Sequence, residues 1–211
     1  MLPRKNLIQV TTGGERLIHW LLAVSCIILL ITGLGLMFKA FEFLTLFLGG
    51  YKGMKLIHNY TGLVFTVSMV LSLIIWYREG AILKDYDIAW IKKGGGYLWK
   101  VKDLPEAGRF NAGQKIFFIL VIVVGALMFI TGIIMWFSLS FPHALVRLSY
   151  MLHALGVVTI GGALTSHIFL GTANPGSFQA MMHGYVTRGW VKLQHPRWLK
   201  EVEGHKSEAK K

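Results

Sequence analysis

The sequence is poor in cysteine, with Cys26 the only one among 211 residues. A single thiol cannot form a disulfide or a thiolate-bound metal cluster within the chain, so neither kind of site is available here. Cys26 also lies inside a long apolar run, where cysteine behaves as a small buried hydrophobic residue.

Charge is missing from four long stretches. No Asp, Glu, Lys or Arg occurs in residues 17–38, 56–77, 116–141 or 148–178. Each stretch reaches the roughly 20 apolar residues that a helix needs to cross the hydrocarbon layer, whereas a helix at the surface of a soluble core would carry a charged face. The sequence therefore predicts an all-α integral membrane protein, a bundle of four transmembrane helices. Their expected bounds are about 17–38, 56–77, 116–138 and 148–172.

Acidic residues are scarce, ten against 22 Lys and Arg, which leaves a net charge of +12. A basic balance can indicate nucleic-acid binding, but the positions of these charges favour a membrane explanation. With the N-terminus inside, 18 basic residues fall on the inner side and only Lys39, Lys52, Lys55 and Arg147 fall outside. This bias follows the positive-inside rule and predicts that both termini are cytoplasmic. Membrane lipid, and no nucleic acid, is the expected partner of this surface.

Two regions are predicted along the chain. Residues 1–178 form the four-helix membrane domain, and residues 179–211 form a cytoplasmic basic tail. No small-residue cleavage site follows the first apolar run, so we expect this helix to be retained as an anchor. Thr12 and Glu15 stand three residues apart just before it, which predicts a capping box at the start of the first helix.

Four of the eight histidines lie within the charge-free stretches. Ionisable residues at membrane depth are costly and usually mark function, although each alone would also suit a hydrogen bond to a neighbouring helix. Given the predicted topology, His58 and His153 lie near the outer ends of the second and fourth helices. His19 and His167 lie toward the cytoplasmic ends of the first and fourth. Depth therefore pairs His58 with His153, and His19 with His167.

The two histidines of the fourth helix also share a face. His153 and His167 are fourteen residues apart, which corresponds to ~40° about the helix axis and ~21 Å along it. Two axial imidazoles leave a haem iron no open position, which suits electron transfer and not oxygen chemistry. Covalent attachment is excluded because no Cys-x-x-Cys-His occurs. The pattern predicts two stacked b-type haems, with axial iron ligands His58 and His153 for the outer haem and His19 and His167 for the inner.

Other residues near these ligands are less specific. Gly33, Gly62 and Gly156 are expected to leave flat space for a porphyrin, although glycine is also common where membrane helices pack. The remaining histidines fall in loops or in the tail and are assigned no ligand role: His143, His183, His195 and His205.

The sequence resembles the gamma subunit, cytochrome b, of membrane-bound respiratory formate dehydrogenase over nearly its whole length. The resemblance is carried by the four histidines and by four short segments, 15–20 (ERLIHW), 56–58 (LIH), 109–115 (RFNAGQK) and 195–198 (HPRW). The NAGQK stretch is the most specific of these. Histidine pairs alone also fit the related cytochromes b of hydrogenases and thiosulfate reductases.

The resemblance implies the same four haem ligands and a quinone site beside the inner haem. That site maps to Asn111 and Gly113, near His167, with Gln114 as a further candidate. Amide groups of Asn and Gln suit a quinone carbonyl, but Asn111 would equally serve as the N-cap of the third helix.

The resemblance also implies a function and partners. The chain would be the di-haem membrane anchor of a respiratory formate dehydrogenase in the bacterial inner membrane, an electron-transfer and quinone-reducing subunit without a formate-oxidising site of its own. Electrons would arrive from a periplasmic iron–sulfur subunit, served by a molybdenum- or tungsten-containing catalytic subunit. They would pass through two haem b groups to menaquinone or ubiquinone.

Two other functions stay open at the level of sequence. The first is a cytochrome b that serves a hydrogenase or another quinone-linked oxidoreductase, with electrons running in either direction. The second, more distant, is a histidine-based proton or metal transporter. Such transporters generally place Asp or Glu at membrane depth, and none of the four stretches contains one.

Overall fold

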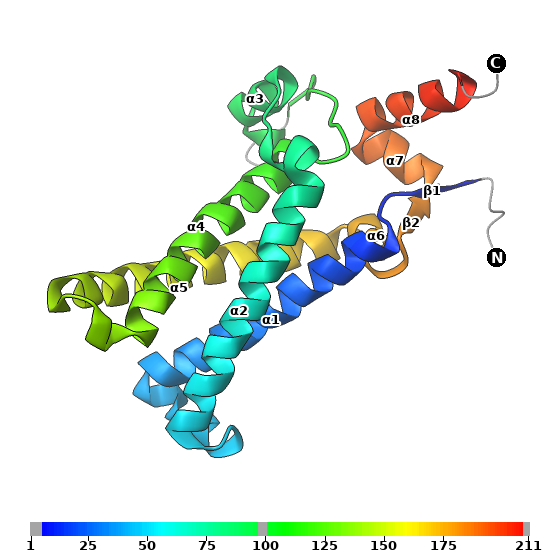
Figure 1. Ribbon diagram of the computed structural model, residues 1–211. Coiled ribbons are helices and arrows are strands. Elements are labelled where there is room, and N and C mark those ends of the chain that lie inside the picture. Colours follow the sequence, from blue (N-terminus) through cyan, green and yellow to red (C-terminus); the bar gives the residue numbers. More distant parts are fainter. Residues whose placement is uncertain (1–5, 97–100, 209–211) are drawn as a thin grey trace. The chain divides into compact units, whose positions relative to one another are not determined.

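The computed structural model describes residues 6–96 and 101–208, and nearly all of its regular structure is helical (Figure 1). Contacts divide the chain into two compact units. The apolar unit comprises Leu17–Ile74 and Leu120–Ile168, and the polar unit comprises Met1–Arg16, Ile75–Ile119 and Phe169–Lys211. Because the chain passes between the units within four helices, each of these helices contributes residues to both.

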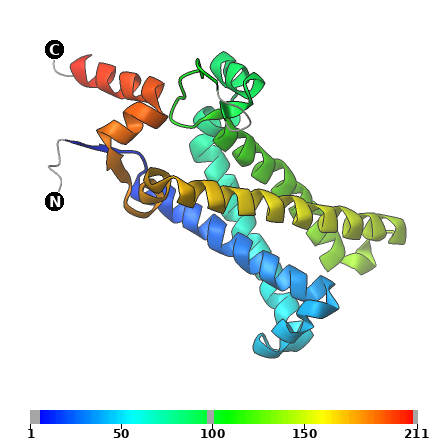
Figure 2. The same ribbon diagram turned by 180° about the vertical axis from the view of Figure 1, so that it is seen from behind.

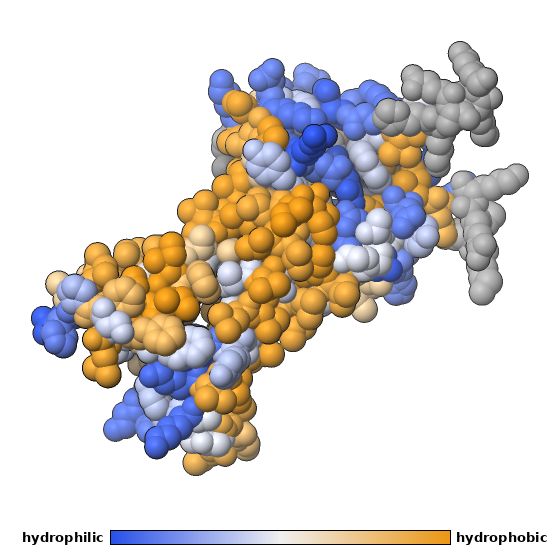
Figure 3. Space-filling view, viewed as in Figure 1, coloured by the Kyte–Doolittle hydropathy of each residue, from blue (hydrophilic) through white to orange (hydrophobic). Residues whose placement is uncertain are grey.

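Among the described residues, four helices are long and apolar enough to cross a membrane, in agreement with the predicted number of spans. They are α1 (Gly13–Met37), α2 (Gly50–Trp76), α4 (Ala112–Trp136) and α5 (His143–Ala173). Hydrophobic side chains cover their visible faces in Figure 3, and large apolar residues such as Val158 (72% exposed) point outward. This surface suits lipid, since a soluble protein seldom exposes large contiguous apolar patches.

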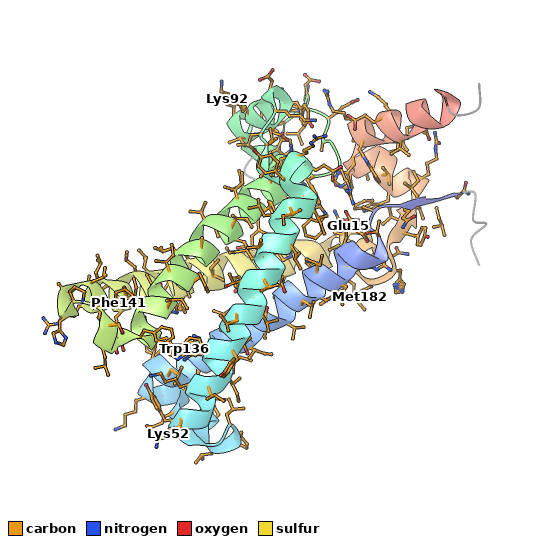
Figure 4. All side chains as sticks on the ribbon, viewed as in Figure 1. Glu15, Lys52, Lys92, Trp136, Phe141 and Met182 are labelled. Carbon is orange, nitrogen blue, oxygen red and sulfur yellow. The ribbon has the colours of Figure 1, made fainter. Side chains whose placement is uncertain are left out.

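The four helices begin a few residues before the predicted bounds, and polar residues cap the start of α1. In α1 the Thr12 hydroxyl accepts from the Glu15 amide at 3.2 Å, and the Glu15 carboxylate accepts from the Thr12 amide at 2.7 Å. This confirms the predicted capping box. Glu15 marks the start of α1 in Figure 4.

Within the apolar unit, small residues let the helices approach closely. A Cβ on Gly125 of α4 would lie 2.5 Å from the Met69 sulfur of α2, and one on Gly156 of α5 would lie 2.2 Å from the Met128 sulfur of α4. Glycine at such crossings is usual in membrane bundles. Trp136, at the C-terminal end of α4, has its ring 5.9 Å from that of Tyr60 on α2 (Figure 4).

Short connections join these helices. A 3₁₀ segment, η2 (Lys39–Phe47), links α1 to α2, and a shorter one, η5 (Ser138–Ser140), precedes α5. In the polar unit α2 continues into a π-helical turn, η3 (Tyr77–Ala81), followed by α3 (Asp85–Lys92) and η4 (Gly94–Gly96).

The rest of the polar unit is built around a small two-stranded sheet. Strand β1 (Leu7–Gln9) pairs antiparallel with β2 (Tyr185–Thr187), with Ile8 opposite Val186. Around it lie α6 (Pro175–His183), α7 (Arg188–Gln194) and α8 (Pro196–Glu208). Ile8 and Val186 share a buried apolar cluster with Ala180, Val191 and Leu199. The segment predicted as a basic tail is therefore folded as far as Glu208.

Candidate functional site

His58 and His153 face each other within the apolar unit. His58 lies on α2 and His153 on α5, and their ring centroids are 6.3 Å apart with planes tilted by 60°. His153 is buried, with 9% of its surface exposed, and His58 is half-buried. The structure thus brings together the two histidines that were paired by depth.

His19 and His167 form a second pair of nearly identical geometry. They lie on α1 and α5, and their ring centroids are also 6.3 Å apart, with a tilt of 54°. The N-terminal part of α1 and the C-terminal part of α5 lie close together in the view from behind (Figure 2). Helix α5 therefore supplies one histidine to each pair, while α1 and α2 supply one partner each.

The spacing within each pair fits two imidazoles on opposite sides of one metal ion. A bond from a first-row metal to an imidazole nitrogen is about 2.0–2.1 Å long, and the nitrogen lies about 1.1 Å from the ring centre, so the centroids are expected roughly 6–6.5 Å apart. Both observed distances fall in this interval. If the two rings of each pair were instead joined by a direct hydrogen bond, nothing would require the same centroid distance of 6.3 Å in both pairs.

The number of donors favours a haem over a bare metal ion. Among the residues that the structure describes, no group of three or more His, Cys, Asp or Glu side chains is placed to hold a metal. Two imidazoles are too few for a structural zinc site, but they complete an iron whose other four ligands are porphyrin nitrogens. The residues present therefore fit haem b.

Threonines on neighbouring helices contact both rings of the His58–His153 pair. Thr32 Oγ1 of α1 lies 2.8 Å from His58 Nδ1, and Thr131 Oγ1 of α4 lies 2.9 Å from His153 Nδ1. Sequence reasoning missed these residues. A signal was present, because each threonine stands in an Ile-Thr-Gly triplet, at residues 31–33 and 130–132.

The glycines of these triplets lie directly beside the rings. A Cβ on Gly33 would be 3.4 Å from His58 Cε1, and one on Gly132 would be 3.5 Å from His153 Cε1. By contrast, Gly62 faces Leu29 and Gly156 faces Met128, so their nearest neighbours are hydrophobic side chains of adjacent helices. Gly33 and Gly132 thus lie beside the rings of the His58–His153 pair, and the porphyrin space expected at Gly33, Gly62 and Gly156 stays a prediction.

The predicted quinone residues lie at the start of α4, in the polar unit. The Asn111 side-chain oxygen accepts from the Gln114 amide at 2.9 Å, and the Gln114 side-chain oxygen accepts from the Asn111 amide at 2.8 Å. Both residues therefore form a capping box, the alternative considered for Asn111. Gly113 packs against Trp90, whose ring would lie 3.4 Å from an added Cβ. The capping bonds use the two amide oxygens and leave the NH₂ groups as donors.

Arg109 organises a network of charges in the same unit. Its guanidinium donates to Glu15 and to Glu79, each at 2.6 Å, and to the Val10 carbonyl at 2.7 Å. The Trp76 indole also donates to Glu15, at 3.0 Å. The carboxylate that caps α1 is thereby tied to residues far along the chain. A separate ion pair joins Lys115 to Asp87 at 2.6 Å, with both side chains almost fully buried.

The four histidines without an assigned ligand role lie elsewhere. His143 begins α5 and His183 ends α6, while His205 lies in α8 with its side chain outside the described residues. His195 is buried at 5% exposure, and its Nδ1 lies 2.8 Å from the Gly108 carbonyl. Burial disfavours the charged imidazolium and lowers the pKa of His195, with the Gly108 carbonyl partly opposing the shift.

The fold and the site together define a class, an integral membrane protein of four apolar helices that carry two matched histidine pairs. The family model of prokaryotic cytochrome b561 matches residues 10–184, so this chain belongs to the prokaryotic cytochrome b561 family. Cytochromes b hold haem b without covalent attachment, in agreement with the missing Cys-x-x-Cys-His.

Curated relatives cover almost the whole chain. It is 30% identical to the formate dehydrogenase cytochrome b556(fdo) subunit of Escherichia coli K12, over 95% of this chain and 96% of the relative. The nitrate-inducible formate dehydrogenase cytochrome b556(Fdn) subunit of the same organism is 28% identical, over 100% of this chain and 97% of the relative. The formate dehydrogenase cytochrome b556 subunit of Haemophilus influenzae is 31% identical, over 88% of this chain and 79% of the relative.

Proposed function

We propose that this chain is the di-haem membrane subunit of a respiratory formate dehydrogenase, which conducts electrons from an iron–sulfur partner to quinone. The observation that carries the proposal is the pair of matched histidine couples, each with ring centroids 6.3 Å apart. Relatives named as cytochrome b556 subunits of formate dehydrogenase support the choice of complex.

His58 and His153 would hold one haem, and His19 and His167 the other. When bound, each haem supplies a one-electron iron couple. Each histidine pair would hold one haem and would keep oxygen and other ligands from its iron. The surrounding apolar helices would exclude water from the haems. Little solvent would then have to rearrange when the haem iron changes between its ferric and ferrous states.

The orientation of the chain is part of the proposal. The distribution of Lys and Arg supports cytoplasmic termini and an inner-membrane location. The His58–His153 pair then lies toward the periplasm and the His19–His167 pair toward the cytoplasm. Each electron carried inward works against about 2.3 kcal/mol per 100 mV of membrane potential, negative inside. Oxidation of formate outside and uptake of protons inside would store that work as proton-motive force.

Quinone reduction is assigned to the start of α4. Asn111 and Gln114 keep their NH₂ groups as donors for a quinone carbonyl while their oxygens cap the helix. The Trp90 ring, which packs against Gly113, offers an aromatic surface beside these donors. Menaquinone and ubiquinone both present carbonyls of this kind.

The proposed partners follow from the names of the relatives and from the need for a source of electrons outside this chain. An iron–sulfur subunit would deliver electrons at the periplasmic end, and a molybdenum- or tungsten-containing subunit would oxidise formate. A hydrogenase or another oxidoreductase in the same place is the alternative that the family itself leaves open. A histidine-based transporter is disfavoured, because the four charge-free stretches offer no carboxylate at depth.

The test is the haem content of histidine variants. His153→Ala and His167→Ala should each reduce the haem content of the purified complex from two per chain to one, because each removes a ligand of a different pair. Reduced-minus-oxidised spectra and pyridine haemochrome assays measure this directly. His143→Ala, on the same helix but outside both pairs, is the control and should retain both haems. Two haems in both pair variants would overturn the proposal.

A further inference from the structure

We propose that Thr32 and Thr131 are positioning residues that fix the orientation and tautomer of both axial ligands of one haem. This inference rests on the proposed function, namely that His58 and His153 hold a haem. It concerns the Ile-Thr-Gly triplets of α1 and α4.

The hydrogen bonds of each hydroxyl determine which way the histidine proton must point. A threonine hydroxyl has one proton to donate and lone pairs to accept. Thr32 Oγ1 lies 2.7 Å from the Ile28 carbonyl, and Thr131 Oγ1 lies 2.8 Å from the Leu127 carbonyl. A carbonyl only accepts, so each hydroxyl proton is used within its own helix. The hydroxyl oxygen then faces the imidazole as an acceptor.

The histidine side of each contact must therefore be the donor. His58 Nδ1 lies 2.8 Å from Thr32 Oγ1, and His153 Nδ1 lies 2.9 Å from Thr131 Oγ1. A proton on Nδ1 leaves Nε2 of the neutral ring unprotonated. Nε2 is then the atom with a lone pair for iron. The bond also raises the basicity of the ligand, as outer-shell acceptors do for metal-bound histidine.

Both threonines are built into the interior of the apolar unit. Thr32 is 2% exposed and Thr131 is 3% exposed. Each lies on a different helix from the ring it contacts, so the helix that carries the histidine does not by itself set the ring's rotation. The following glycine leaves the ring edge free of a Cβ. The same arrangement thus occurs twice around one histidine pair, once for each ligand.

Hydrogen bonds from threonine to the carbonyl four residues earlier are ordinary in helices. Thr66 of α2 makes such a bond to the Gly62 carbonyl at 2.8 Å and, among the interactions of the described residues, has no histidine partner. It therefore serves as a matched control for any effect of losing a helix-internal hydroxyl.

The experiment compares Thr32→Val, Thr131→Val and Thr66→Val in the assembled complex. Valine keeps the shape of threonine but offers no oxygen to Nδ1. We expect the midpoint potential of the His58–His153 haem to rise in the first two variants, because a less basic ligand stabilises the ferric iron less. The affinity for that haem should fall about 10–100-fold, and the EPR signal of its ferric form should change as the ring planes reorient. The potential of the other haem and all properties of Thr66→Val should stay unchanged.

Serine variants separate the hydroxyl from the packing of the side chain. Thr32→Ser and Thr131→Ser keep the hydroxyl and should retain the wild-type potential. An unshifted potential and EPR signal in both valine variants would overturn the inference, as would an equal shift in the serine variants. These outcomes are distinct from failure of the proposed function, in which His153→Ala would retain both haems.

Discussion

Lys115 and Asp87 illustrate how single residues stabilise the polar unit. Their charged groups are 2.6 Å apart, and their side chains are 3% and 2% exposed. Lys115 also donates to the Ile82 carbonyl at 3.0 Å. A pair this buried is costly to desolvate, but it is far more costly to break, because the Asp87 carboxylate would then be buried with only the Lys84 amide as a donor among the described residues and without a positive charge beside it.

Lys115→Met should therefore lower the free energy of unfolding by about 3–5 kcal/mol. Thermal or denaturant unfolding in detergent would measure this loss. The control is Lys200→Met, which breaks the exposed Lys200–Glu106 pair, with side chains 71% and 43% exposed. That change should cost no more than about 1 kcal/mol. Equal losses in the two variants would contradict the role given to burial.

His195 gives the polar unit a pH dependence. Its pKa is lowered in the folded chain because of burial, whereas in the unfolded chain it is about 6.5. Below that pH the unfolded state binds more protons, so the contribution of His195 to stability is present above about pH 6.5 and is lost as the pH falls. His195→Asn offers an amide near the position of Nδ1 and should show a weaker fall in melting temperature between pH 8 and 5.5. Parallel curves for both proteins would contradict this assignment.

At the scale of elements, the start of α4 combines two roles that different substitutions separate. Asn111 and Gln114 cap each other across the first turn of the helix. Asn111→Ala removes both the cap and the amide donor, whereas Asn111→Asp keeps an oxygen for the cap and removes the NH₂ group.

We expect Asn111→Ala to lose about 1 kcal/mol of stability together with quinone reduction. Asn111→Asp should keep near wild-type stability but still lose quinone reduction, because its carboxylate does not donate to a carbonyl. Melting temperature and quinone-reductase rate, measured with a soluble electron donor in the whole complex, separate these effects. Full activity in Asn111→Asp would leave the residue with its capping role alone.

For the whole molecule, the two histidine pairs make the apolar unit dependent on its cofactors. Helix α5 shares one pair with α1 and the other with α2, so a haem in each pair would join three helices. A ligand that binds only the folded state stabilises it by mass action. Protein from haem-depleted cells should therefore melt at a lower temperature than the haem-replete form. Hydrogen exchange should rise mainly in residues 17–74 and 120–168, and unchanged exchange in those residues would argue against haem as a structural element.

Local signals in the sequence determined much of this protein. Four charge-free runs predict four helices because only an apolar helix satisfies its backbone in lipid. Thr12 and Glu15 predict a helix start because a capping box needs only residues three positions apart. The spacing of His153 and His167 places both on one face, and topology then pairs them with His58 and His19. The iron that these pairs are expected to hold stays a prediction.

Only the tertiary structure shows the contacts between residues that are far apart in the chain. The contacts of Thr32 with His58 and of Thr131 with His153 cross between helices, and no spacing rule links their positions. The same holds for Lys115 with Asp87, for Arg109 with Glu15, and for the pairing of β1 with β2. Helix periodicity follows from neighbours along the backbone, whereas these partners are selected by how helices pack and by the need to satisfy every buried polar group.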